Sequence, residues 1–183
     1  DHTIAFLLDG QIWSMNSDGS YRKKLSSSDI EIEGFRFSPD RKKVLLIKSI
    51  PYYGTIKKNP SDLPKASGRL ITDMNYRHWD HYVQENLHPF LADVTGNTIN
   101  EGKDILEGEP YECPMAPFGG VEQLAWSPDS KTIAYTCRKK EGVNYAISTD
   151  SDIFLYTIST KQTRNLCKPA DYKEPAIDAS KTM

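Results

Sequence analysis

Residues 120–140 read Gly-Val-Glu-Gln-Leu-Ala-Trp-Ser-Pro-Asp-Ser-Lys-Thr-Ile-Ala-Tyr-Thr-Cys-Arg-Lys-Lys, and this stretch indicates a β-hairpin. Leu124 and Trp126 fall on one face of an extended segment, and residues 133–137 form a second β-rich segment. The Ser-Pro-Asp-Ser sequence between them is typical of a turn, because proline fixes φ while serine and aspartate bond back to the backbone. The rest of the chain repeats this unit.

The repeat extends over most of the sequence. Residues 35–47 align without a gap on residues 124–136, which places Phe37 on Trp126 and Val44 on Ile133. A second hairpin repeats as well: residues 12–25 align on residues 153–166, and residues 90–97 align on residues 154–161, with Leu106 taking the place of Leu166. Each unit is therefore predicted to hold four strands, and the spacing of roughly 40 residues is that of a β-propeller blade.

We therefore predict an all-β fold, a β-propeller with four-stranded antiparallel blades, about three of which are present. The predicted division assigns residues 1–28 to the end of one blade and 118–168 to a complete one. Residues 29–109 form a blade with an arm inserted at 51–87, and residues 169–183 start a further blade. A propeller needs at least four blades to close its ring. We expect a piece of a longer protein, whose open sheet edges make the isolated chain self-associate.

Charge and cysteine content exclude some classes of function. The 183-residue chain has a net charge of −2 with scattered basic residues, which argues against a nucleic-acid partner. No apolar run approaches the roughly 20 residues of a membrane span, and no signal peptide opens the chain, although an export signal could have preceded it. Cys113, Cys137 and Cys167 lack the Cys-x-x-Cys spacing of zinc and redox sites, so free or buried thiols are predicted, with a structural disulfide as the disfavoured alternative.

Several aromatic positions recur at the same place in successive repeats. Trp13, Phe37, Trp126 and Phe154, together with Ile133, are predicted to be buried, because packing of sheet on sheet needs large apolar residues at such positions. An aromatic ligand cage is the disfavoured alternative.

The arm is the segment that the repeat does not explain. Its second half carries an aromatic and charged run, and loops of this length in a compact domain tend to be functional or disordered. We single out as candidate substrate-binding residues Arg77, Trp79, Asp80, Tyr82 and Glu85. Asp80 or Glu85 could pair with the free amino group of a peptide; the alternative is that Arg77 and Asp80 only anchor the arm while Trp79 packs.

A metal site on the arm is disfavoured. His78 and His81 flank Asp80, and imidazole and carboxylate are ordinary zinc ligands. A three-residue spacing needs a helical turn to converge, however, and no second ligand pair supports it. We therefore expect no metal and no cofactor.

The repeats, with their Ser-Pro-Asp turns, resemble the propeller repeats of TolB-type periplasmic proteins and of the prolyl oligopeptidase family of serine peptidases. The run Arg77-His78-Trp79-Asp80-His81-Tyr82 resembles the Arg-x-Trp-Asp segment of bacterial dipeptidyl-peptidase and acylaminoacyl-peptidase members of that family. The sequence departs from the family at Arg41 and Ser130, where glycine is usual; each would carry strain of about 1 kcal/mol if its φ is positive.

The resemblance implies a non-catalytic N-terminal propeller that gates and recognises peptide substrates. Its partner would be a C-terminal α/β-hydrolase domain with a Ser-Asp-His triad, in a secreted or periplasmic exopeptidase. No Gly-x-Ser-x-Gly nucleophile sequence occurs in this chain, so no catalytic residue is assigned and the chain alone should be inactive. The alternatives are a TolB-like periplasmic scaffold that binds proteins and a WD-type interaction propeller, which is disfavoured because no Gly-His…Trp-Asp signature recurs.

Overall fold

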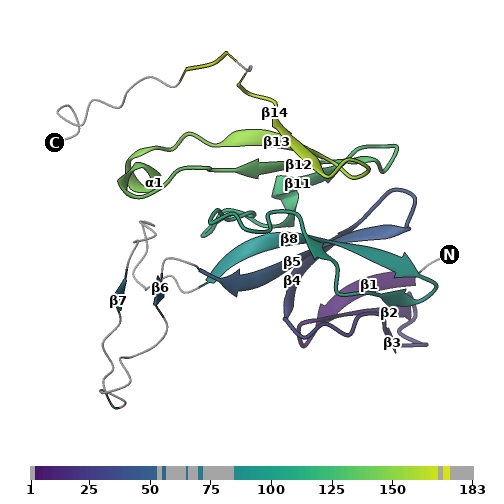
Figure 1. The fold of residues 1–183 in the computed structure, drawn as a ribbon. Coiled ribbons are helices and arrows are strands. Elements are labelled where there is room, and N and C mark those ends of the chain that lie inside the picture. Colours follow the sequence, from purple (N-terminus) through teal and green to yellow (C-terminus); the bar gives the residue numbers. More distant parts are fainter. Residues whose placement is uncertain are drawn as a thin grey trace.

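A computed structural model describes residues 3–52, 55–56, 65, 70–71, 85–168 and 171–173. These residues form three antiparallel sheets that are stacked face to face (Figure 1). The first sheet has the order β1-β2-β3, and its strands are β1 (Thr3–Leu8), β2 (Gln11–Asn16) and β3 (Lys23–Lys24).

The second sheet lies in the middle of the stack. Its order is β10-β8-β5-β4, and its strands are β4 (Ile32–Phe37), β5 (Lys43–Pro51), β8 (Glu85–Thr95) and β10 (Lys103–Asp104). A short strand, β9 (Thr98–Ile99), also pairs with β8. Within the arm, β6 (Thr55–Ile56) pairs with β7 (Leu70–Ile71).

The third sheet is a regular meander with the order β11-β12-β13-β14. Its strands are β11 (Leu124–Trp126), β12 (Thr132–Cys137), β13 (Asp152–Thr157) and β14 (Gln162–Asn165). A 3-10 turn, η1 (Val121–Gln123), precedes it, and a five-residue helix, α1 (Val143–Ile147), lies between β12 and β13. Stacked four-stranded antiparallel sheets are the blades of a β-propeller, so the predicted fold class is confirmed.

Strand β5 carries four successive apolar residues, Val44 to Ile47, because both faces of the middle sheet are covered. Successive side chains of a strand point to opposite faces. Val44 and Leu46 enter a cluster with Ile12 of the first sheet, whereas Leu45 and Ile47 enter a second cluster with Ile133 of the third sheet. Since both faces of β5 are covered, a polar residue on either face would be buried.

The aligned turns have the same backbone conformation. Arg41 and Ser130 both adopt a φ of 60°, in the left-handed region where side chains are strained. In each turn the serine hydroxyl donates to the aspartate two residues on, at 2.7 Å for Ser38 to Asp40 and 2.6 Å for Ser127 to Asp129. Both Ser-Pro-Asp sequences therefore form the predicted turn with its side-chain hydrogen bond. Arg41 and Ser130, which replace the usual glycine, have the positive φ for which strain was expected.

The predicted burial of the five apolar repeat positions is only partly correct. Ile133 and Phe154 are buried, at 0% and 7% exposure. Trp13, Phe37 and Trp126 are only partly buried, which corrects the prediction. Trp13 points away from the cluster that holds its neighbour Ile12, toward a face of the first sheet that no described sheet covers.

The other two aromatic rings lie at the ends of their strands rather than in the middle of the sheets. Trp126 is the last residue of β11, and its ring spans the joint between the second and third sheets. Phe37 is the last residue of β4, where it packs edge-on against Phe35. The central core positions are filled instead by aliphatic residues such as Leu45 and Leu124, both 0% exposed.

Two further expectations concern thiols and membrane spans. All three cysteines are free thiols; Cys113 and Cys137 are buried, whereas Cys167 is exposed. Burial raises the pKa of the Cys137 thiol from its ordinary value to about 12, which makes the reactive thiolate rare at neutral pH. None of the helices in the described ranges has the length and apolar character needed to cross a membrane.

Candidate functional site

The connections between the second and third strands of the blades meet at one end of the stack. In the second sheet this connection is residues 52–84, which lie within the predicted arm at 51–87, and in the third sheet it is residues 138–151, which hold α1. In the first sheet the equivalent turn is only Asp9 and Gly10. Figure 1 shows β6 and β7 of the arm and α1 on the same side of the three sheets. The fold therefore gathers its longest insertions at one face, which we call the arm face.

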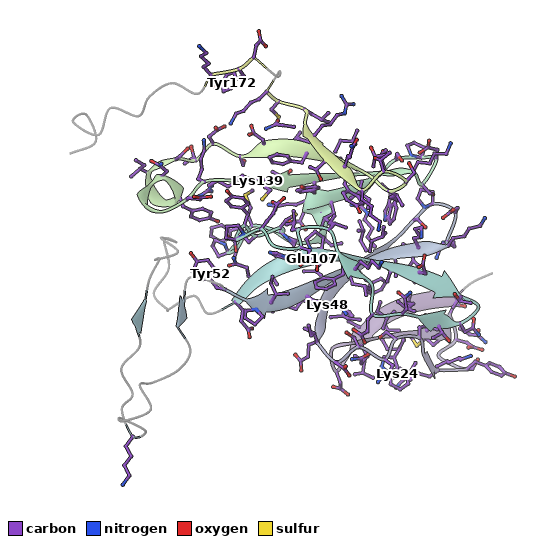
Figure 2. All side chains as sticks on the ribbon, in the orientation of Figure 1. Lys24, Lys48, Tyr52, Glu107, Lys139 and Tyr172 are labelled. Atoms are coloured by element: carbon purple, nitrogen blue, oxygen red, sulfur yellow. The ribbon has the colours of Figure 1, made fainter. Side chains whose placement is uncertain are left out.

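The root of the arm is fixed to the sheet. Pro51 pairs with Glu85 at the end of the ladder between β5 and β8, and the flanking residues Tyr52 (Figure 2) and Asn86 are 6% and 2% exposed. The side-chain amide of Asn86 donates a hydrogen bond of 2.8 Å to the carbonyl of Pro110. The first and last residues of the insertion are thus held in place by the ladder and by the neighbouring segment.

Of the candidate residues on the arm, the described residues include only Glu85. It is the first residue of β8 and is exposed at the arm face. Arg77, Trp79, Asp80 and Tyr82 lie outside the described residues, as do His78 and His81. Their convergence with Glu85 stays a prediction.

Exposed carboxylates also lie at this end of the first and second sheets. Asp9, Asp29, Glu31 and Glu33 are exposed and lie in the β1–β2 turn or at the start of β4, the end of the second sheet that also carries Glu85. Glu33 accepts a hydrogen bond of 2.7 Å from the hydroxyl of Ser49. These carboxylates favour cations at the ends of the first and second sheets, whereas the connection of the third sheet begins with the basic residues Arg138, Lys139 and Lys140.

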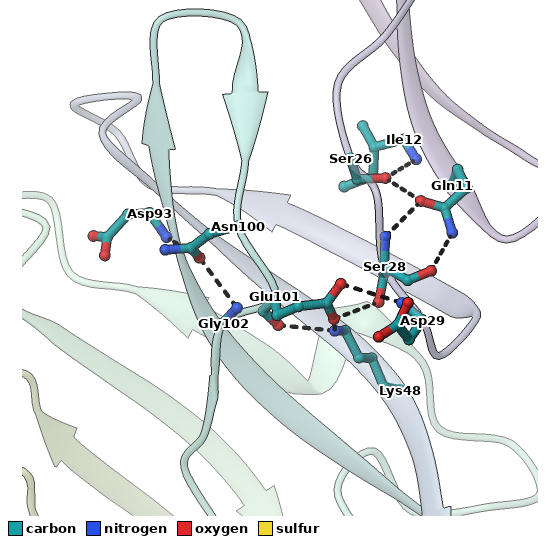
Figure 3. A network of polar contacts seen from close by, with 10 residues as sticks. All are labelled: Gln11, Ile12, Ser26, Ser28, Asp29, Lys48, Asp93, Asn100, Glu101 and Gly102. Atoms are coloured by element: carbon teal, nitrogen blue, oxygen red, sulfur yellow. Dashed lines mark hydrogen bonds and ion pairs between the residues drawn. The ribbon is translucent and has the colours of Figure 1, made fainter.

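The first and second sheets are joined behind this face by a polar network (Figure 3). The Lys48 side chain is only 1% exposed, and its ammonium donates to the carboxylate of Glu101 at 2.7 Å and to the Glu101 carbonyl at 2.8 Å. The Glu101 carboxylate also accepts from the hydroxyl of Ser28 and the backbone N–H of Asp29, at 2.9 and 3.1 Å. The buried charge of Lys48 is thereby paired and hydrogen-bonded, as burial of a charge requires.

The second and third sheets are joined at the arm face by two tyrosine–glutamate hydrogen bonds. The hydroxyl of Tyr111 donates to Glu141 at 2.8 Å, and the hydroxyl of Tyr145 in α1 donates to Glu112 at 2.5 Å. Burial, reinforced by Glu141, raises the pKa of Tyr111 to about 12, so this hydroxyl remains a donor. We call these four residues the tyrosine–glutamate clamp.

Sequence reasoning missed the clamp. The adjacent residues Tyr111 and Glu112 lie after the last strand of one blade, and Glu141 and Tyr145 lie in an insertion of the next. Only the stacking of the two sheets brings these segments together. One feature of the sequence pointed to these residues. Both segments lie outside the repeat, so the hairpin pattern does not account for their tyrosine and glutamate residues.

A groove of about 700 Å³ lies between the second and third sheets, and its lining includes Lys43, Lys103, Glu107, Tyr156 and Lys161. Lys43 starts β5 and Lys161 lies in the β13–β14 turn, so the groove reaches the end opposite the arm face. Among the residues that the structure describes, no group of three or more histidine, cysteine or acidic side chains could hold a metal ion.

Curated relatives of the chain are dipeptidyl-peptidases. Over 135 residues, 74% of this chain, it is 50% identical to dipeptidyl-peptidase 5 of Porphyromonas gingivalis. Over 156 residues, 85% of this chain, it is 40% identical to dipeptidyl-peptidase 5 of Porphyromonas endodontalis. The chain spans only 20% and 23% of the length of these two relatives. No protein-family model matches the chain.

The fold comparison agrees with the stacked sheets. An acylaminoacyl peptidase from Pyrococcus horikoshii superposes on 90% of this chain with a TM-score of 0.52 and 15% sequence identity, using 23% of its own length. At this identity the likeness concerns the fold alone. Together with the relatives, it confirms the resemblance to the propeller portion of dipeptidyl- and acylaminoacyl-peptidases.

Proposed function

The chain is a propeller portion similar to that of dipeptidyl-peptidases, and from this premise we propose that it recognises and gates peptide substrates without catalysing their cleavage. The parent protein would be a secreted or periplasmic serine exopeptidase. A C-terminal α/β-hydrolase domain would supply the nucleophile, because no Gly-x-Ser-x-Gly sequence occurs in this chain.

The observation that carries the proposal is the concentration of insertions and carboxylates at the arm face. An exopeptidase that removes dipeptides must locate the free α-ammonium group of its substrate. Glu85 is exposed at the root of the arm, and Asp9, Asp29, Glu31 and Glu33 are exposed at the same end of the first and second sheets. A carboxylate lining draws a cationic amino terminus toward this face, and one closely placed carboxylate then pairs with it.

Within this proposal the arm provides the close contact. Asp80 or Glu85 pairs with the α-ammonium, and Arg77, Trp79 and Tyr82 complete the substrate-binding surface. The fixed root at Pro51 and Glu85 supports this role, because a recognition residue must be held in place.

The test uses the full-length parent protein with Asp80→Ala and Glu85→Ala variants. Loss of an ion pair in a partly desolvated site costs on the order of 2–5 kcal/mol, so kcat/KM on free-amine peptides should fall at least about thirtyfold. Cleavage of N-acylated peptides should be unchanged. The control is Glu107→Ala, which removes an exposed carboxylate outside the arm face.

Two outcomes would contradict the proposal. An equal loss on both substrates, accompanied by a lower melting temperature, would make the arm a structural element only. A parent reading frame that continues into further blades without a Gly-x-Ser-x-Gly sequence would favour the TolB-like alternative, a scaffold that binds proteins.

A further inference from the structure

The two contacts between stacked sheets use the same pair of faces. Directly opposed residues of neighbouring strands point to one face of a sheet. On the third sheet Tyr135 is paired with Phe154, and both pack on the second sheet in one core cluster. On the second sheet the equivalent pair, Leu46 and Phe90, packs with Ile12 of the first sheet. We call the face that packs on the preceding sheet the leading face, and the opposite one the trailing face.

The leading face of the first sheet is covered by no sheet in the described ranges. Its central pair is Phe6 and Trp13, which by alignment and strand pairing are equivalent to the two aromatic residues of the third sheet. Ile4 and Met15 form the next pair on this face. Ile4 is 43% exposed, whereas Val44 at the equivalent position of the second sheet is 0% exposed. The first sheet therefore presents an apolar leading face of the kind that the other two sheets bury.

The trailing face of the third sheet likewise has no sheet over it among those that the structure describes. Ala134 and Leu155 form its central row, and Ile153 beside them is 45% exposed. Ile153 is equivalent to Ile12, which is 0% exposed because the second sheet covers the trailing face of the first. Leu155 is equivalent to Leu91, which packs on the third sheet from the trailing face of the second. The stack thus has an uncovered leading face at one end and an uncovered trailing face at the other (Figure 1).

We propose that the uncovered leading face of one copy of the chain binds the uncovered trailing face of a second copy. This contact repeats the pairing that the chain uses twice within itself, in which a leading face with aromatic rings packs on an aliphatic trailing face. A head-to-tail contact produces a ring if its rotation closes and a filament if it does not. Two copies of three blades supply six, within the roughly four to eight blades of closed propellers, whereas three copies would supply nine. The assembly is therefore a closed dimer.

The contact follows from the fold and is independent of the proposed function. In a parent protein with further blades, the same two faces would meet blades of the parent's own chain, so the partner copy belongs to the 183-residue chain alone. The contact also differs from pairing of strand edges. Edge pairing joins copies through β1, whereas the proposed contact uses the faces of the central strands β2 and β13.

Basic side chains at the rim of the two faces weaken the contact. Lys24 is paired with Trp13 on the leading face, where the guanidinium of Arg22 also lies 5.9 Å from the ring centre of Phe6. Arg164 belongs to the central row of the trailing face. Since Lys24 and Arg164 lie on the outermost strands, β3 and β14, the dimer brings like charges together at its outer rim. Arg164→Glu should therefore tighten the dimer about two- to fivefold, the effect of an exposed ion pair.

The experiment measures the mass of the 183-residue chain by sedimentation velocity over a range of concentrations. The wild-type chain is expected to form dimers. Met15→Lys on the leading face and Ile153→Lys on the trailing face should each raise the dissociation constant at least about tenfold, because the contact would bury a charge without a partner. Both residues lie on central strands, so neither change alters a strand edge. The matched control is Ile30→Lys, which replaces an isoleucine that is 39% exposed in the β3–β4 connection and should leave the dimer unchanged.

Mixing the two lysine variants tests the head-to-tail orientation. Either variant alone has lost one face from every contact. An equimolar mixture keeps one intact contact, between the trailing face of the Met15→Lys chain and the leading face of the Ile153→Lys chain. The mixture is therefore expected to form a dimer with one chain of each kind. Circular dichroism identifies a variant that fails to fold, and Met15→Gln or Ile153→Thr then takes its place.

Four results would overturn the inference. A wild-type chain that stays monomeric at high concentration has no such contact, and oligomers larger than a dimer would show that the ring does not close. Dimers that persist in both lysine variants but are lost in Leu7→Lys are joined through the edge of β1 instead. A mixture that stays monomeric although both variants are folded would show that the two faces do not bind each other.

Discussion

Trp126 and Arg36 join the second and third sheets by reciprocal hydrogen bonds. The indole Nε1 of Trp126 donates to the carbonyl of Arg36 at 3.0 Å, and the guanidinium of Arg36 donates to the carbonyl of Leu124. Each side chain thus bonds to a backbone carbonyl in the strand of the other residue. Trp126 lies at the end of the sheets opposite the arm face. Repeat equivalence places Phe37 at the Trp126 position of the preceding blade, where no such donor exists.

Trp126→Phe should lower the free energy of unfolding by about 1 kcal/mol, because it removes one hydrogen bond while keeping most of the ring. Denaturant midpoints measure this. Trp13→Phe is the matched control, since the buried Nε1 of Trp13 has no partner in the part of the chain that the structure describes. An equal loss in both variants would show that ring packing, rather than the bond to Arg36, is the source.

Arg41→Gly should stabilise the protein by about 0.5–1 kcal/mol. Relief of the left-handed conformation gains about 1–2 kcal/mol, and the greater freedom of glycine in the unfolded state offsets part of that. Ser130→Gly should gain less, because the Ser130 hydroxyl accepts a hydrogen bond of 3.2 Å from the Asp40 N–H. The melting temperature in thermal unfolding measures this gain. The control is Arg41→Ala, which keeps the Cβ and the strain and should therefore show no gain in stability.

The two Ser-Pro-Asp turns should make stability depend on pH in the acidic range. The pKa of Asp40 is lowered chiefly by the hydrogen bond from Ser38, and the pKa of Asp129 by that from Ser127. A lowered folded-state pKa contributes stability that is present above the unfolded pKa, about 4, and is lost as the pH falls through the folded value. Denaturant midpoints should decline below about pH 4, and less steeply in an Asp40→Asn, Asp129→Asn double variant. Identical pH profiles would contradict the assignment.

Glu101→Ala should destabilise the protein more than Lys48→Met. Removing the carboxylate leaves the buried Lys48 ammonium with only the Glu101 carbonyl as a described acceptor, and breaking a buried pair in this way costs about 3 kcal/mol. Lys48→Met leaves the Glu101 carboxylate, whose side chain is 49% exposed, in contact with water. This substitution should lower the free energy of unfolding by about 1 kcal/mol or less. Urea unfolding of both variants measures the difference, and the reverse order would show that the Lys48 stem packing dominates.

The isolated 183-residue chain should self-associate. Strand β1 is the edge of the first sheet, and Ile4, Leu7 and Leu8 on it are 43%, 36% and 38% exposed. An unpaired apolar edge is a template for another strand. Light scattering should show oligomers whose proportion falls in Leu7→Lys, while a monomer at high concentration would be contrary to this expectation.

The sequence by itself determined the strands, their pairing and the turns. Alignment of residues 35–47 on 124–136 predicted two equivalent hairpins, and the two glycine-replacing residues Arg41 and Ser130 share one φ. These features depend on contacts between residues close in the chain, so local pattern and turn chemistry were sufficient. The resemblance carried by the repeats and by the run at 77–82 likewise needed no coordinates.

Only the tertiary structure decided which repeat positions are buried and which residues meet at the arm face. Trp13 and Phe154 are equivalent in sequence, yet Phe154 is 7% exposed because the second sheet covers it, whereas Trp13 is only partly buried because no described sheet covers its face. The clamp between Tyr145 and Glu112 likewise joins residues from different blades. Burial and contacts between blades depend on how the sheets stack. Stacking brings together residues far apart in the sequence, so a sequence repeat does not predict which of its positions are buried.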